Sequence, residues 1–197
     1  MENRITFYLL RHGEKEKTMG DPPLTQRGIN QAENTARFLK QYAITSIYAS
    51  PLLRTKQTAQ IIGKALGLEV IIDDRLKERM NWGDKPGETF DEFMQEWEKG
   101  SKNRTYKPTH GESAFLTGER FKEFLMEISD VSGTNVLVVT HGGTIGDFLL
   151  NEFTDLTLTS SPSGATYVNL DECSITTVQL QDNMFVLKEV GGVTHLI

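Results

Sequence analysis

The sequence predicts an α/β domain of three layers, in which helices cover both faces of a mostly parallel central sheet. Short apolar runs alternate with segments whose apolar residues recur at every third or fourth position, which is the pattern of strands alternating with amphipathic helices. Toward the end of the chain this alternation gives way to consecutive strand-like runs. The length of 197 residues suits one such domain.

The parallel strands are predicted from short apolar or β-branched runs that polar residues, glycine or proline bound on both sides. Four runs have this form: Ile5–Leu10, Ile44–Ala49, Val70–Ile72 and Val136–Thr140. We expect these strands to be buried, because strands that are covered on both faces lack an alternating polar side.

A helix is predicted after each of the first two strands. Thr25 is a candidate N-cap for the first helix. The apolar residues that follow it have helical spacing: Ile29, Ala32, Ala36, Leu39 and Ala43. The second helix begins near Arg54 and ends at Gly67, because glycine adopts the left-handed conformation that often ends a helix.

Residues 73 to 112 are predicted to leave this alternation as a cap-like excursion over the strand ends. A short helix within it is indicated by aromatic and apolar residues at helical spacing: Phe90, Phe93, Met94 and Trp97. We expect these side chains to form the core of the excursion, with Trp82 or Trp97 within reach of a ligand. Residues 1–197 then form a single domain with a cap.

The second half of the chain predicts two more helices and three late strands. Ser113 is expected to cap a helix that reaches Ile128, and another helix with Ile145, Phe148 and Leu149 follows the strand at Val136–Thr140. The late runs are separated by acidic and amide residues and suggest antiparallel strands: Tyr167–Leu170, Ser174–Leu180 and Phe185–Val190. Which of these strands join the main sheet stays open.

The composition limits the kinds of partner. With 21 Lys and Arg against 27 Asp and Glu, the net charge of −6 gives no support to a nucleic-acid surface. Any bound anion must therefore be held locally. The single cysteine, Cys173, cannot form an internal disulfide, so a reducing, cytoplasmic location is expected. No uncharged run supplies the ~20 apolar residues of a membrane span, so no membrane partner is expected.

Two histidines occupy matching positions at predicted strand ends. His12 follows the first strand, His141 follows the strand at Val136–Thr140, and a glycine comes directly after each. The carboxyl ends of parallel strands meet at one edge of the sheet, where ligands of α/β proteins bind. Either histidine alone would more often be structural, but the pair favours a functional site.

The charges beside these histidines favour an anion over a metal. A metal site completed by Glu14, Glu78 or Glu112 is the first alternative. Arg11 lies next to His12 and would repel a divalent cation, and Arg54 adds a second arginine near a helix N-terminus. Guanidinium groups and helix N-termini both bind phosphate oxygens. The sequence therefore predicts a phosphate site.

Three motifs and one glutamate, taken in chain order, carry a resemblance to a known family: Arg11-His12-Gly13-Glu14, Ser50-Pro51-Leu52-Leu53-Arg54-Thr55, Glu78 and Thr140-His141-Gly142-Gly143. Over nearly its full length the chain resembles the histidine phosphatase superfamily, in its phosphoglycerate mutase-like branch. The resemblance implies a phosphoglycerate mutase-like sandwich that transfers a phosphoryl group to histidine and then to water or a second acceptor. It implies no metal and no other cofactor.

The resemblance also implies roles for the site residues. His12 would be the nucleophile, and Glu78 the general acid that protonates the leaving group and later accepts a proton from water. The groups implied to bind the phosphoryl oxygens lie at the strand ends: Arg11, Gly13, Arg54, His141 and Gly142. Of these, both arginines and His141 would also stabilise the transition state.

Three further residues near the site receive supporting interpretations. Glu14 and Glu112 are expected to orient the guanidinium groups. Arg120, on the helix that follows Ser113, is either a partner for one of these glutamates or solvated, and the solvated position is preferred.

The sequence departs from the family pattern at positions that concern the substrate. Members commonly carry Ser or Thr three residues after the nucleophile and Asn six residues after it, where this chain has Lys15 and Thr18. The chain is also short of the extended cap of a mutase. We therefore expect a phosphatase acting on a small phosphorylated metabolite, as a monomer or homodimer. The alternatives are a phosphoglycerate mutase, a non-catalytic phosphate-binding protein and a metallohydrolase.

Overall fold

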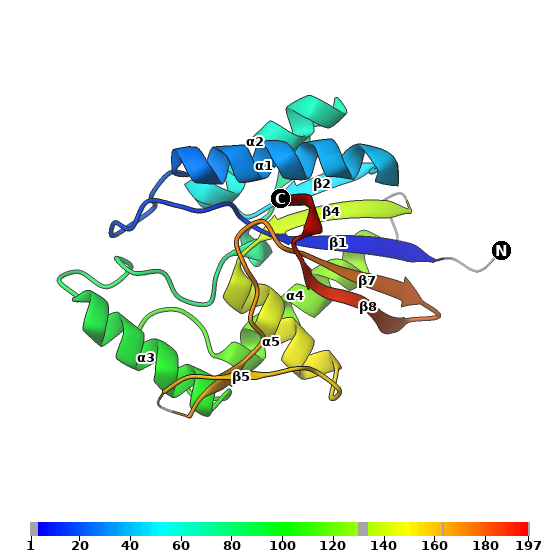
Figure 1. Cartoon of the computed structure of the whole chain (residues 1–197). Helices are drawn as coiled ribbons and strands as arrows, with labels where there is room; N and C mark the ends of the chain where they lie inside the picture. Colours follow the sequence, from blue (N-terminus) through cyan, green and yellow to red (C-terminus); the bar gives the residue numbers. More distant parts are fainter. Residues whose placement is uncertain (1–3, 130–133, 163, 197) are drawn as a thin grey trace.

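The computed structural model describes residues 4–129, 134–162 and 164–196. Its centre is a six-stranded sheet of order β3-β2-β4-β1-β7-β8 (Figure 1). The strands are β1 (Ile5–Arg11), β2 (Ser46–Ala49), β3 (Val70–Ile72), β4 (Asn135–Thr140), β7 (Ile175–Gln181) and β8 (Met184–Gly192). The first four run parallel, β7 runs antiparallel to β1, and β8 runs antiparallel to β7. The predicted mostly parallel sheet is confirmed, and the last two late strands extend it.

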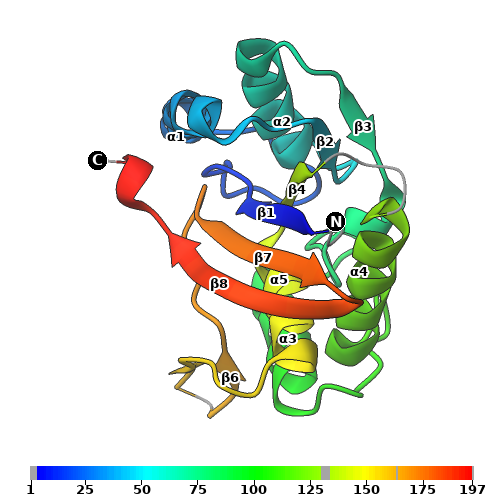
Figure 2. The same ribbon diagram turned by 90° about the vertical axis from the view of Figure 1, so that its right-hand side faces the viewer.

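Helices cover both faces of this sheet (Figure 2). One face carries α1 (Gln26–Leu39) and α2 (Leu53–Leu66), and the other carries α4 (Ala114–Ser129) and α5 (Gly142–Glu152). Successive side chains of a strand point to opposite faces, so β1 contributes to two cores. Phe7 and Leu9 pack on the side of α4 and α5, and Tyr8 and Leu10 pack on the side of α1 and α2. The three-layer α/β/α prediction is confirmed.

Local capping interactions explain where the helices begin and end. The Thr25 hydroxyl accepts a hydrogen bond from the Gly28 amide at 3.0 Å, and the Ser113 hydroxyl accepts one from the Leu116 amide at 3.2 Å. Gly67 ends α2 with φ of 70°. The first helix is shorter than its apolar pattern predicted, because Ala43 has left-handed backbone geometry and ends a 3₁₀ turn. No helix in the described ranges is long and apolar enough to cross a membrane.

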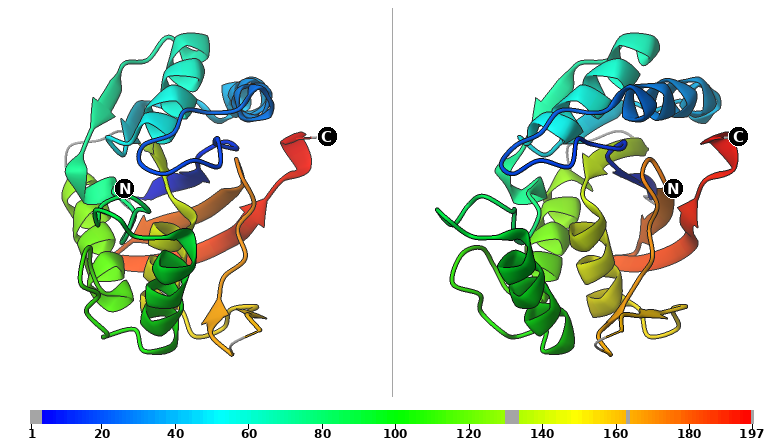
Figure 3. Two further views of the ribbon diagram at one scale, coloured as in Figure 1. Left: turned by 90° about the vertical axis from the view of Figure 1, so that its left-hand side faces the viewer. Right: turned by 60° about the vertical axis from the view of Figure 1, so that its left-hand side comes forward.

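The segment between β3 and α4 lies beyond the carboxyl ends of the parallel strands (Figure 3). It contains a 3₁₀ turn at Asp74–Leu76 and α3 (Phe90–Lys102), which lies near a small hairpin of β5 (Thr159–Ser160) and β6 (Thr166–Tyr167). The prediction of a strand over Tyr167–Leu170 is wrong beyond its first residue. β6 pairs only with β5 in the described chain, and the Leu170 carbonyl accepts a hydrogen bond from the Arg11 side chain instead of pairing in a sheet.

Two glycines let α1 pack directly on the backbone that follows β1. A Cβ atom at Gly28 would lie 2.0 Å from the Glu14 carbonyl oxygen, and one at Gly13 would lie 2.6 Å from the Gly28 carbonyl oxygen. Backbone atoms cannot yield as a flexible side chain can. The close approach therefore fixes the segment that carries His12.

Replacing Gly28 by alanine is expected to destabilise the protein by about 1–3 kcal/mol, the usual cost of overpacking. The same change at Gly100 in α3 is the matched control, because a Cβ there meets nothing within 4 Å. Gly100→Ala should stabilise the protein by about 0.5–1 kcal/mol through helix propensity. Urea unfolding of both variants tests the opposite signs, and a stabilising Gly28→Ala would refute the close-packing argument.

Candidate active site

A pocket of about 670 Å³ lies at the edge of the sheet where β1 and β4 end. It brings together five of the residues predicted to form the site: Arg11, His12, Arg54, Glu78 and Gly142. A mainly apolar wall faces them, formed by Phe90, Phe93, Met94, Trp97, Leu150 and Val168. The pocket thus has a basic, histidine-containing end and an apolar side.

The hydrogen bonds of His12 leave its Nε2 as the acceptor nitrogen of the ring. Its Nδ1 lies 2.8 Å from the Gly13 carbonyl oxygen, which can only accept, so we assign the proton to Nδ1. The lone pair then lies on Nε2, 3.3 Å from Nε of Arg54. Burial, together with the charge of Arg54, lowers the pKa of His12 well below its usual value. The imidazole is therefore neutral at neutral pH and suited to nucleophilic attack.

Gly13 differs from its predicted role as a substrate-binding residue. Its amide donates to the Thr58 hydroxyl at 3.1 Å, its carbonyl faces the His12 ring, and the residue does not line the pocket. Both backbone groups are thus used inside the protein. The prediction that Gly13 contacts substrate is wrong, and its place is to orient His12.

His141 lies directly beside His12 but is completely buried. The two ring centroids are 5.3 Å apart. Nε2 of His141 lies 2.8 Å from the Ser50 hydroxyl, while its Nδ1 has no hydrogen-bond partner among the described residues. Burial, followed by the charge of Arg54, lowers the pKa of His141 well below its usual value, so this ring is also neutral.

Arg54 extends from the first turn of α2 into the pocket. Its side chain is 4% exposed. Nη2 donates to the Asn81 side-chain oxygen at 3.3 Å, and Nη1 lies 3.8 Å from the Asp21 carboxylate. Nη1 has no hydrogen-bond partner in the part of the chain that is described. No sequence pattern pointed to Asp21 or Asn81, because both lie in irregular loops.

Arg11 is oriented from the loop that precedes β7. Its guanidinium donates to the Leu170 carbonyl and, at 2.8 Å, to the Glu172 carboxylate. Glu14 was expected to orient such a guanidinium, and that prediction is wrong. It lies 3.3 Å from exposed Arg27 instead. Glu172 could not be found from the sequence, because 161 positions separate it from Arg11.

Glu78 receives three hydrogen bonds where the 73–112 segment passes α5. The Gly143 amide donates to Oε2 at 3.0 Å, and the Thr144 hydroxyl and the Arg79 amide donate to Oε1, each at 3.1 Å. The side chain of Arg79 turns away to Asp147. Glu78 is thus a positioned carboxyl group in the pocket wall rather than a member of a surface ion pair.

Arg120 braces the segment that leads to Glu78. Its Nε donates to the Glu112 carboxylate at 2.9 Å, and its other nitrogens donate to the carbonyls of Arg75 and Lys77. The expectation that Arg120 is solvated is wrong, because helix α4 packs against this segment. Glu112 does orient a guanidinium, but it is that of Arg120 and not of the site arginines Arg11 and Arg54, so the prediction for Glu112 is also wrong.

The carboxylates named for the metal alternative are dispersed. Glu14 contacts Arg27, Glu112 contacts Arg120, and Glu78 accepts hydrogen bonds from α5. Within residues 4–129, 134–162 and 164–196, no three His, Cys, Asp or Glu side chains gather closely enough to hold a metal ion.

The fold is an α/β/α sandwich, and one edge of its sheet carries two histidines, two arginines and a carboxyl group. These features define a class of α/β protein with a histidine-centred anion site. The geometry described above is of that class. The chain belongs to the histidine phosphatase superfamily (branch 1), whose family model matches residues 7–192.

Individual relatives cover the chain almost completely. A protein of Yersinia pestis (strain Pestoides F) named probable phosphoglycerate mutase GpmB is 32% identical over 98% of this chain and 95% of its own length. A phosphoglycerate mutase from Bacillus anthracis has a TM-score of 0.76 at 23% identity, covering 99% of this chain and 96% of that one. A phosphoserine phosphatase from Entamoeba histolytica, solved with phosphoserine, has a TM-score of 0.74 at 24% identity, covering 98% and 100%. The two structures show that the fold is shared.

Proposed function

We propose that this protein is a metal-independent phosphatase that hydrolyses small phosphomonoesters through a covalent phosphohistidine at His12. In this proposal residues 1–197 form one histidine phosphatase domain, and residues 73–112 act as its cap. Family membership supports phosphoryl chemistry in general.

The observation that carries the proposal is a pair of buried nitrogens without hydrogen-bond partners beside His12. Nη1 of Arg54 and Nδ1 of His141 have no hydrogen-bond partner among the described residues. Buried polar atoms are seldom left unpaired, because each costs about 1–3 kcal/mol. Phosphoryl oxygens would accept from both nitrogens if His141 carries its proton on Nδ1 and accepts from the Ser50 hydroxyl at Nε2.

The first step would form a phosphorus–nitrogen bond. Nε2 of His12 attacks phosphorus in line, and the bond from phosphorus to the leaving oxygen breaks. Protonated Glu78 gives its proton to that oxygen. Arg11 and Arg54 hold the equatorial oxygens, where their fixed charge stabilises the transition state.

The second step would return the enzyme to its starting state. Water attacks the phosphorus of phosphohistidine while the Glu78 carboxylate takes a proton from that water. The phosphorus–nitrogen bond breaks, and orthophosphate leaves. His12 is then neutral and Glu78 is protonated, so protons balance over the cycle.

Hydrolysis is favoured over mutase activity by the contents of the pocket. Phe90, Phe93 and Leu150 in its wall offer no donor to a second phosphate, and the Arg79 guanidinium is engaged by Asp147 and Ser101. The 73–112 segment contributes one α-helix, α3, rather than an extended cover that would retain an intermediate. The name of the Yersinia relative makes phosphoglycerate mutase the second candidate.

The test is a turnover panel in excess EDTA with p-nitrophenyl phosphate, sugar phosphates, nucleotides and phosphoglycerates. We expect release of orthophosphate that chelation leaves unchanged. Loss of activity in EDTA would refute the metal-independent mechanism. Bisphosphoglycerate-dependent interconversion of phosphoglycerates that is faster than hydrolysis would instead identify a mutase. Phosphate binding without turnover of any ester would identify a binding protein.

A further inference from the structure

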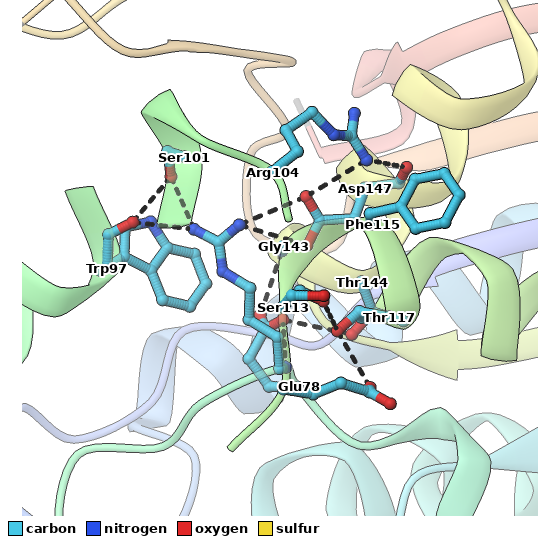
Figure 4. Close-up of polar contacts among 12 residues, drawn as sticks. Glu78, Trp97, Ser101, Arg104, Ser113, Phe115, Thr117, Gly143, Thr144 and Asp147 are labelled. Atoms are coloured by element: carbon cyan, nitrogen blue, oxygen red, sulfur yellow. Dashed lines mark hydrogen bonds and ion pairs between the residues drawn. The ribbon is translucent and has the colours of Figure 1, made fainter. Parts of the chain in front are cut away.

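A cluster of charged side chains, two of them buried and one half-buried, lies in the pocket wall behind Glu78 and takes no part in the proposed phosphoryl transfer. Its members are Arg79, Arg104 and Asp147, and all three line the pocket. Asp147 projects from α5, and its side chain is 6% exposed. Figure 4 shows its carboxylate beside the guanidinium of Arg104, with Trp97 and Ser101 of α3 across from it.

Asp147 holds Arg79 on one side. Nη1 of Arg79 lies 3.3 Å from each carboxylate oxygen. Its Nη2 donates to the Ser101 hydroxyl at 2.6 Å and to the Trp97 carbonyl at 3.2 Å. The guanidinium also lies 3.8 Å over the Trp97 ring. Arg79 is thus immobilised between α3 and α5.

Arg104 approaches Asp147 from the other side. Its Nη2 donates to the Asp147 carbonyl at 2.9 Å and to the Asn151 side chain at 2.5 Å, and it lies 4.0 Å from the Asp147 carboxylate. Its Nη1 is buried without a hydrogen-bond partner in the described part of the chain. Both guanidinium groups line the pocket, and the Asp147 carboxylate offsets their positive charge. Two guanidinium groups without such a counter-charge are the arrangement that binds a carboxylate or phosphate.

The rest of the pocket does not supply a substitute anion site at this wall. Phe93, Met94 and Trp97 of α3 are apolar neighbours of the cluster in the lining. Lys15 lies nearer the phosphoryl end, where the charges of Arg54 and Arg11, after burial, lower its pKa. Lys17 is exposed, so solvent screens its charge.

We propose that Asp147 determines leaving-group specificity. Its carboxylate hydrogen-bonds Arg79 and lies 4.0 Å from Arg104, and so offsets the charge that both guanidinium groups present to the substrate. The pocket then selects phosphomonoesters whose leaving group is uncharged and apolar over those that carry a carboxylate or a second phosphate. This inference rests on the proposed phosphatase activity, because it concerns the alcohol released in that reaction.

The charge of Asp147 sets the conditions of the test. Burial raises the pKa of Asp147 to about 7, with Glu78 adding to the rise while Arg79 and Arg104 oppose it. The carboxylate is therefore mainly ionised above this pH. We would compare substrates at about pH 8, where an ionised carboxylate exerts its full effect.

The experiment compares kcat/KM for 4-carboxyphenyl phosphate with kcat/KM for phenyl phosphate, since these esters differ by one carboxylate. Asp147→Asn is expected to raise this ratio about tenfold or more, the discrimination that one charge-assisted hydrogen bond supplies. A merely structural role for Asp147 would lower both values together. A ratio unchanged in an active Asp147→Asn variant would overturn the inference.

A matched second variant keeps the test decisive. The kcat/KM ratio of 4-carboxyphenyl phosphate to phenyl phosphate should follow the net charge of the cluster. Arg104→Met should therefore lower the ratio. The double variant Asp147→Asn/Arg104→Met should return the ratio to within about threefold of wild type. If Asp147→Asn does not fold, the test compares Arg104→Met with the double variant. The ratio should be higher in the double variant, and equal ratios in these two variants would refute the inference. Failure of the wild-type protein to hydrolyse phenyl phosphate would instead refute the proposed function.

Discussion

Replacing His12 by alanine is expected to reduce hydrolysis of p-nitrophenyl phosphate by about 10⁴-fold or more, as removal of a covalent nucleophile does in other enzymes. The loss should appear in kcat. His141 cannot take over, because in the proposed site its Nδ1 carries a proton and its Nε2 accepts from the Ser50 hydroxyl, which leaves it no free lone pair. Added imidazole should restore activity to His12→Ala, because it can occupy the vacated space and act as the missing nucleophile.

The covalent step has its own measurement. Quenching the wild-type reaction in base should trap phosphate on the protein, because phosphohistidine survives base and breaks down in acid. The His12→Ala protein should trap none. His110→Ala is the matched control, because His110 is exposed and does not line the pocket. If the His12→Ala protein hydrolysed p-nitrophenyl phosphate near the wild-type rate, the phosphohistidine mechanism would be refuted.

Replacing Glu78 by glutamine is expected to produce a loss that depends on the leaving group. Alkyl phosphates need a proton on the departing oxygen, so their kcat/KM should fall by about 10²–10⁴-fold, the usual contribution of general acid catalysis. p-Nitrophenyl phosphate should lose far less, because nitrophenolate leaves readily without a proton. The measurement is the slope of log kcat/KM against leaving-group pKa, which should become steeper.

The matched control for that slope is Glu123→Gln, an exposed position on α4. It should leave both the rates and the slope unchanged. If Glu78→Gln lowered all esters by one common factor, Glu78 would be acting on the shape of the pocket, through its hydrogen bonds from Gly143 and Thr144, and not as a proton donor.

The site residues that could be predicted from the sequence are those whose positions follow from the order and direction of the strands. His12 and His141 end the neighbouring strands β1 and β4, whose register pairs Arg11 with Thr140. Arg54 begins the helix after β2, which also neighbours β4. Parallel strands end at one edge, so alternation alone was enough to bring these residues together.

The partners that the sequence missed lie on irregular segments. Glu172 reaches Arg11, and Asp21 and Asn81 reach Arg54, from loops with no periodic pattern. Gly13 was misjudged for a related reason. Its amide could have pointed at a ligand, and only the tertiary hydrogen bond to Thr58 decides that it does not.

The packing and pairing of strand β1 determine how the active site responds to local opening of the chain. Its side chains enter both cores, and it pairs with β4 on one edge and β7 on the other. A strand held this way opens only when the whole domain unfolds, whereas loops open at lower free energy. His12 therefore keeps its position during local openings of the chain. Glu78 is tied to the same frame, because it accepts hydrogen bonds from Gly143 and Thr144 in the first turn of α5. The proposed reaction would thus hold its phosphoryl acceptor and its proton donor at a constant separation, and alcohols of different shape would be accommodated elsewhere in the pocket.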